Sequence, residues 1–132
     1  MTTTSIGTPA ADAAQRLILA SKVNGTPVFN RDGERIGHVE DVAIGKLDGK
    51  VGYAILSFGG FIGIGEKYNP LPWSILTYDT DKNGYVISLD KEQLKLAPSY
   101  SKEELADIGD TDERYRNTIY DYYGPFGATP YW

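Results

Sequence analysis

The segment 79–90 holds the side chains of this sequence that are best suited to binding a metal ion. Their spacing follows an EF-hand calcium loop, in which carboxylate and amide oxygens coordinate Ca²⁺: Asp79, Asp81, Asn83 and Asp90. An EF-hand also needs a helix entering the loop, and Pro70 and Pro72 stand where that helix would run. Asn83-Gly84 between two apolar runs fits a hairpin turn equally well. We therefore expect a hairpin here, with calcium binding over residues 79–90 as the weaker alternative.

His38 is the single histidine of the chain and lies two residues before Glu40. Alternate residues of a strand share a face, so these two side chains can pair. One imidazole beside carboxylates makes no selective metal site, and no Ser-His-Asp set can be assembled around it. The sequence contains no Cys, which excludes thiol catalysis and thiolate metal sites. We predict no catalytic, cofactor-binding or metal-binding residues and do not expect an enzyme.

A glycine-rich run spans residues 59–65. A phosphate-binding loop would need Gly-Lys-Ser/Thr ahead of a helix, whereas Asn69-Pro70 follows here and opposes a helix start. The run is therefore predicted to be a loop that exposes Phe61 and Ile62. Two uses are open for these side chains: contact with another protein, or packing on the end of the chain's own fold.

The last eighteen residues are unusually aromatic, since they hold five of the ten tyrosines. The candidate interaction residues of this segment are Tyr115, Ile119, Tyr122, Tyr123, Phe126, Tyr131 and Trp132. Three of them, Tyr115, Ile119 and Tyr122, fall on one helical face at i, i+4, i+7 spacing. Aromatic rings bring much contact area at low entropy cost, as in protein interfaces. We predict an ordered segment that packs either on its own fold or across a subunit boundary.

The net charge of −5 is concentrated at the end of the chain. Residues 17–100 carry nine Lys or Arg against ten Asp or Glu, and residues 101–132 carry three against seven. An acidic extension repels phosphate, so we expect no nucleic-acid partner. Residues 1–16 lack the basic start and apolar core of a signal peptide, and no apolar run approaches the ~20 residues that span a bilayer. We expect a cytoplasmic protein without direct membrane insertion.

Turn signals divide the first hundred residues into short strands: Asp32-Gly33, Asp48-Gly49 and Asn83-Gly84. A strand over residues 35–45 would place three apolar side chains on one face: Ile36, Val42 and Ile44. Val39 falls on the other face, which predicts a bulge or a strong twist near residues His38 to Glu40. Residues 51–58 are apolar or small almost throughout, as is typical of a central strand. This pattern indicates an antiparallel barrel or sandwich.

Helix signals appear only late in the chain. Asp90 with Gln93 and Ser101 with Glu104 form capping boxes that predict two short helices. A third helix is expected over residues 112–123, ended by Gly124-Pro125.

Three motifs in order resemble the PRC-barrel family. They are Asp32-Gly33-Glu34-Arg35-Ile36-Gly37-His38-Val39-Glu40-Asp41-Val42, Tyr53-Ala54-Ile55-Leu56-Ser57-Phe58-Gly59-Gly60 and Leu71-Pro72-Trp73-Ser74-Ile75-Leu76. The resemblance implies a mainly β fold, a small antiparallel β-barrel of about six strands, here with short C-terminal helices. We expect a flexible arm over residues 1–15, the barrel over 16–100, and an acidic, aromatic-rich extension over 101–132.

The resemblance also implies a function in assembly rather than catalysis. The cytoplasmic barrel of the photosynthetic reaction-centre H subunit and the C-terminal domain of the ribosome-maturation factor are similar, and both offer the barrel as a binding surface. This chain lacks the membrane helix of the first and the RNA-associated domain of the second, so it resembles the stand-alone bacterial members. We expect a protein-binding module that forms a homodimer or higher homo-oligomer; the alternative is an adaptor in ribosome maturation or RNA metabolism that acts through a protein partner.

Overall fold

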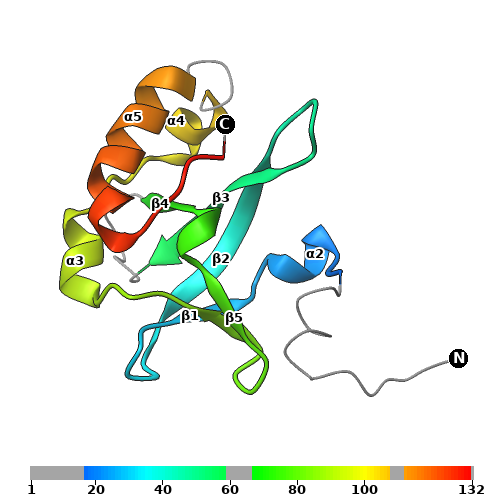
Figure 1. The fold of residues 1–132 in the computed structure, drawn as a ribbon, viewed down its shortest axis with the longest axis vertical. Helices are drawn as coiled ribbons and strands as arrows, with labels where there is room; N and C mark the ends of the chain where they lie inside the picture. Colours follow the sequence, from blue (N-terminus) through cyan, green and yellow to red (C-terminus); the bar gives the residue numbers. More distant parts are fainter. Residues whose placement is uncertain (1–16, 59–66, 108–111, 132) are drawn as a thin grey trace, which may run out of the picture.

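A computed structural model describes residues 17–58, 67–107 and 112–131 of the chain (Figure 1). The elements follow in the order α2 (Ala20–Val23), β1 (Pro27–Phe29), β2 (Arg35–Ile44), β3 (Val51–Phe58), β4 (Tyr68–Pro72), the 3₁₀ turn η1 (Trp73–Ile75), β5 (Thr77–Asp79), β6 (Gly84–Val86), α3 (Lys91–Leu96), α4 (Lys102–Ala106), α5 (Asp112–Tyr123) and η2 (Gly124–Phe126). Six strands followed by short helices confirm the expected mainly β class with C-terminal helices.

The six strands form one sheet in the order β4-β3-β2-β1-β6-β5. In the described parts of the chain, the edge strands of this sheet are β4 and β5. The short turn η1 connects them along the chain, but in the described residues no backbone hydrogen-bond ladder between them closes the sheet into a barrel. One pairing departs from the antiparallel pattern, because β1 and β6 run parallel. Taken together, the pairings give β5 the same sense in the sheet as β4, which it follows through η1. Its hairpin partner β6 must then reverse and run alongside β1.

The expected turns and bulge are present. Gly33 and Gly49 take positive φ values of 85° and 73° in the first two hairpins, and Asn83 takes 50° in the third. The β2–β3 register shifts between Val39 and Asp41, as the sequence predicts. A second shift, in the β1–β2 pairing, adds one residue at Ile36. At Gly37 beside it, a Cβ would lie 2.2 Å from the carbonyl oxygen of Ser57, so only glycine fits.

The two bulges of β2, together with a further register shift between Ala43 and Ile44 in the pairing with β3, change which residues of β2 face the core. Ile36 and Val39 are both buried, although simple alternation would put them on opposite faces. Ile44, expected to share the core face with Ile36 and Val42, is instead 48% exposed, and Val42 is half-buried. The expected face of this strand was therefore wrong, because each bulge shifts the two-residue alternation by one position.

The strand β3 is the centre of the fold, as its apolar composition predicts. It lies between β2 and β4, and every residue from Gly52 to Leu56 is buried. Its neighbour β4 tolerates Pro70 and Pro72 because it is an edge strand, where a missing N–H breaks no ladder bond.

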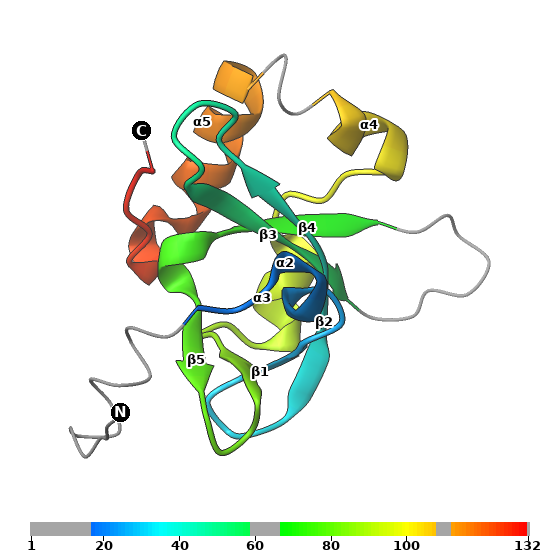
Figure 2. The ribbon, with the colours of Figure 1, turned by 90° about the vertical axis from the view of Figure 1, so that its right-hand side faces the viewer.

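The helices α3, α4 and α5 gather on one side of the sheet, and α5 packs on β4 (Figures 1 and 2). Both capping boxes form: Asp90 accepts from the backbone N–H of Gln93 at 2.8 Å, and Ser101 from that of Glu104 at 3.2 Å. In the second box the bond from the Ser101 N–H holds the pKa of Glu104 below its usual value. The helix over residues 112–123 forms as expected, and η2 follows it at Gly124.

Candidate functional site

The aromatic tail packs against its own chain. Ile119 and Tyr123 are fully buried in the same core as β3 and β4, and the Tyr122 hydroxyl donates to the carbonyl oxygen of Gln93 on α3. The ring of Tyr131 lies over Gly52, with its centroid 5.4 Å from that of Tyr53. Within the single chain, residues 115–131 thus pack on their own fold, and contact of this segment with a second subunit stays a prediction. Ile119 and Tyr123 offer no surface in this conformation.

The other candidate interaction residues are differently placed. Tyr115 and Phe126 are half-buried, the first edge-on to Tyr100 at 4.9 Å between ring centroids and the second against Tyr122 at 5.9 Å. Phe61, Ile62 and Trp132 lie outside the described residues, as does the whole glycine-rich run. Whether any of these side chains contacts a partner stays a prediction.

Segment 79–90 is a hairpin followed by a helix start. Strands β5 and β6 pair antiparallel, and the turn between them contains Asp81 and Asn83 of the EF-hand-like pattern. The Asp79 carboxylate accepts from the backbone N–H groups of Asp81 and Lys82 at 2.9 and 3.2 Å. The Asp90 carboxylate caps α3 instead of facing the turn. Within the described ranges, no group of three or more His, Asp or Glu side chains could hold a metal ion.

His38 and Glu40 pair as their spacing predicts, with 3.3 Å between Nε2 and Oε1. Both side chains are 38% exposed, on the surface of β2. The pair lies on an open strand face, where Ser57 of β3 is the cross-strand neighbour of His38.

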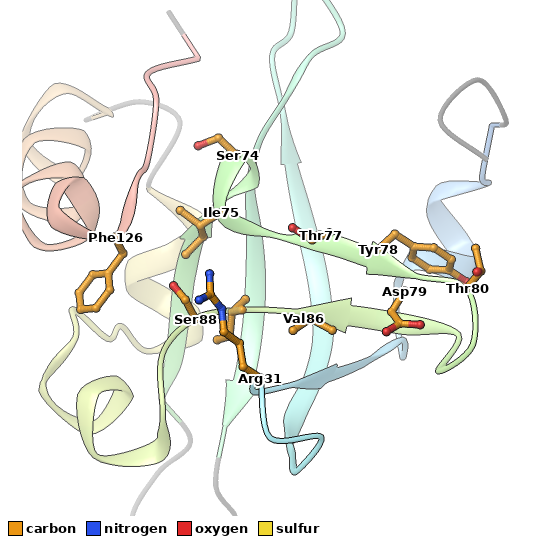
Figure 3. A pocket seen from close by; sticks show the side chains of 11 residues that line it. Arg31, Ser74, Ile75, Thr77, Tyr78, Asp79, Thr80, Val86, Ser88 and Phe126 are labelled. Carbon is orange, nitrogen blue, oxygen red and sulfur yellow. The ribbon is translucent and has the colours of Figure 1, made fainter. Parts of the chain in front are cut away.

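A shallow groove of about 610 Å³ crosses the outer face of the β5–β6 hairpin (Figure 3). Ile75 and Val86 contribute apolar surface, Phe126 closes one end, and Arg31 extends into the groove toward Ser88. The lining contains hydroxyl groups, the guanidinium of Arg31 and the carboxylate of Asp79, but no histidine or cysteine. Chemically the groove can hold a polar group; its carboxylate, that of Asp79, accepts hydrogen bonds from the turn backbone. Sequence analysis missed it because its residues come from four separate segments.

Large apolar side chains are exposed at seven positions in the described parts of the chain: Leu17, Ile18, Leu19, Ile44, Leu47, Tyr78 and Leu96. Five of them belong to two segments on one side of the molecule, the residues just before α2 and the β2–β3 hairpin (Figures 1 and 2). We call this side the hairpin face, defined by Leu17, Ile18, Leu19, Ile44 and Leu47. The apolar run 17–19 is visible in the sequence, but nothing in the pattern shows that it stays outside the core.

The strand edges of the sheet are unequally protected. Tyr68 and Tyr100 exchange two backbone hydrogen bonds of 2.8 Å along the outer edge of β4, where the prolines also lack N–H groups. The edge strand β5 has only three residues. Beyond Val39, β2 is flanked by β3 alone among the described strands. There the N–H of Val42 is bonded to the carboxylate of Asp41 at 2.8 Å.

The described helices include none that is both long and apolar enough to span a membrane. Among curated proteins, no sequence similar to this chain was found. The family model of the PRC-barrel domain matches residues 16–94, more than half of the chain. Domains of this family are generally non-enzymatic modules. The chain belongs to the PRC-barrel domain family.

Proposed function

We propose that this protein is a non-enzymatic assembly module that binds protein partners and associates with itself. The observation that carries the proposal is the hairpin face. Leu17, Leu19 and Leu47 are 99%, 68% and 103% exposed, a costly arrangement for side chains that favour burial. Exposed large apolar side chains on two segments of the same side of the molecule favour a protein contact there.

The polar side chains of the fold also support this proposal, because several of them stabilise the structure of the chain itself. The carboxylates of Asp79 and Asp90 stabilise a turn and a helix end, and the hydroxyl of Ser74 bonds to the backbone of Thr129. Their hydrogen-bonding capacity is used in holding the chain together. The function we propose therefore depends on the shape and apolar surface of the fold.

Light scattering coupled to size exclusion, over a wide range of protein concentrations, tests the proposal. A concentration-dependent mass that approaches twice the 14.5 kDa of one chain is expected. A mass of one chain at every concentration would contradict self-association. A pull-down from native extract, identified by mass spectrometry, would then show whether the module binds other proteins, including ribosomal ones.

A further inference from the structure

We propose that a groove between helices α3 and α5 binds a segment of another protein that carries an apolar side chain next to an arginine or lysine. This inference rests on the proposed protein-binding function and names the chemistry of one partner. The groove has a volume of about 470 Å³, and its lining includes Leu96, Pro98 and Tyr100 on one side and Thr118, Asp121 and Tyr122 on the other. Its described lining residues all follow residue 94, the last that the family model matches, so the groove is built outside the matched domain.

The walls of the groove are largely apolar and are held in place by the fold. Leu96 is 79% exposed at the end of α3, so a partner that covers it removes apolar surface from water. Tyr100 and Tyr122 are half-buried, so each also presents part of its surface. The Tyr122 hydroxyl is bonded to the carbonyl oxygen of Gln93, and the Tyr100 ring packs against Tyr115 with 4.9 Å between centroids. Neither tyrosine therefore has to be ordered when a partner binds.

The carboxylate of Asp121 indicates a basic occupant. It is the one charged group among the described lining residues, and in the described part of the chain no hydrogen bond or ion pair engages its side chain. Asp121 lies in the last turn of α5, which contains no basic side chain. A carboxylate is unfavourable there because the carbonyl end of a helix carries partial negative charge. A cation from a partner would offset both negative charges, and the faces of the neighbouring tyrosine rings attract the same cation.

The charges around the groove favour another protein over a second copy of this chain. The neighbouring cation on α3, Lys95, is already paired with Glu92 at 3.2 Å. A second copy packed symmetrically on this groove would bring two Asp121 carboxylates together, and these repel one another. A nucleic acid would bring phosphate groups to the same carboxylate. A basic protein segment avoids both repulsions.

A pair of short synthetic peptides tests the groove in the full chain. The probe is a peptide in which Arg and Leu alternate, and its control has Glu in place of every Arg. Amide chemical shifts of the isotope-labelled protein, followed during titration, show where each peptide binds and give its dissociation constant. We expect the basic peptide to shift the amides of residues 96–100 and 118–122 in a saturable way, and the acidic peptide to leave them unchanged.

Two pairs of variants separate the groove from a general attraction to an acidic protein. Asp121→Asn removes the carboxylate, and Glu103→Gln makes the same change of net charge at an exposed position of α4. Leu96→Ala shortens the apolar wall, and Leu47→Ala makes the same change in the β2–β3 hairpin, where Leu47 is equally open to solvent. We expect the dissociation constant of the basic peptide to rise about two- to fivefold in Asp121→Asn and about fivefold in Leu96→Ala. In the two controls it should stay within about 1.5-fold of the parent.

The outcomes that would overturn the inference are distinct from those that test self-association. Equal weakening in Asp121→Asn and Glu103→Gln would mean that the peptide follows net charge and not the groove. Saturable shifts confined to the hairpin face would place protein binding on another surface, so this inference fails and the proposed function stands. Shifts of the groove amides that depend on protein concentration without peptide would mean that a second copy occupies the groove. A parent that neither binds the peptide nor associates in light scattering fails both proposals.

Discussion

At the scale of single residues, the neighbouring Tyr122 and Tyr123 differ in whether their hydroxyl groups are hydrogen-bonded. The hydroxyl of Tyr122 donates to the carbonyl oxygen of Gln93. The hydroxyl of Tyr123 is buried and has no hydrogen-bond partner among the described residues. Burying an unpaired hydroxyl costs free energy, whereas the ring that carries it packs against Phe126 with 6.4 Å between centroids.

We predict that Tyr123→Phe leaves the free energy of unfolding unchanged or raises it by up to about 1 kcal/mol, because it removes the unpaired group and keeps the ring. Tyr122→Phe is the matched control and should lower it by about 0.5–1.5 kcal/mol, the net value of one hydrogen bond. Urea titration of the three proteins measures both effects. A larger loss in Tyr123→Phe than in Tyr122→Phe would show that the buried hydroxyl is bonded.

The same tyrosine links stability to alkaline pH. Burial holds the pKa of Tyr123 above its ordinary value of 10.0, with a smaller contribution from Tyr122. The folded protein therefore keeps this proton at a pH where the unfolded chain releases it. The stabilisation is complete below pH 10 and is lost as the pH rises above that value. Burial raises the pKa of Tyr85 and Tyr100 in the same direction.

We expect the urea midpoint of the parent to fall steadily above pH 10 and that of Tyr123→Phe to fall less steeply. Titration in urea at a series of alkaline pH values, with both proteins side by side, measures the two slopes. Equal slopes would mean that Tyr123 titrates alike in the folded and unfolded states.

At the scale of elements, helix α5 packs the acidic extension on the sheet. The side chain of Ile119 on this helix is fully buried within the single chain. We predict that Ile119→Ala lowers the free energy of unfolding by about 2–5 kcal/mol through the cavity it leaves. Asn117→Ala, at an exposed position of the same helix, should leave it unchanged or slightly higher.

Chemical denaturation over a range of protein concentrations measures this effect. Because the contact lies within one chain, the loss caused by Ile119→Ala should not depend on concentration. A loss that appears only where the protein associates would place α5 in a subunit interface instead.

The sequence predicts an element well when the contacts that determine it are between residues close together in the chain. Hairpin turns such as Asp32-Gly33 and the capping box of Asp90 with Gln93 are set by adjacent residues, so the pattern predicts them correctly. The outward position of Ile44 and the parallel pairing of β1 with β6 depend on bulges and on a connection through η1. Neither has a local signal.

For the candidate surfaces, too, the sequence predicts what depends on nearby residues and misses what depends on distant ones. The helical spacing of Ile119 predicts a packed face but cannot say which surface receives it, and the structure supplies its own sheet. The exposure of Leu17 and Leu47 depends on where α2 and the β2–β3 hairpin sit relative to the core. The groove beside Arg31 brings together residues that are up to 95 positions apart in the chain, from Arg31 to Phe126.

At the scale of the whole molecule, the PRC-barrel protein has a near-neutral first part and an acidic C-terminal extension. The acidic extension covers one side of the sheet with α4 and α5, and the near-neutral first half presents the hairpin face on the other. A net charge of −5 on every copy keeps the acidic sides apart. Association should therefore be apolar in character and directed to a single face.

The salt dependence of the dimer dissociation constant tests this central claim most directly. Sedimentation equilibrium of the full chain measures it from low salt up to about 1 M, where the Debye length falls to about 3 Å. Screening weakens the repulsion between two copies of net charge −5 and leaves apolar contacts intact, so we predict that the dissociation constant stays level or falls as salt is added. A dimer that dissociates with added salt would mean that opposite charges hold it together, and a single-chain mass at every salt concentration would mean that no dimer forms; either result would contradict the account.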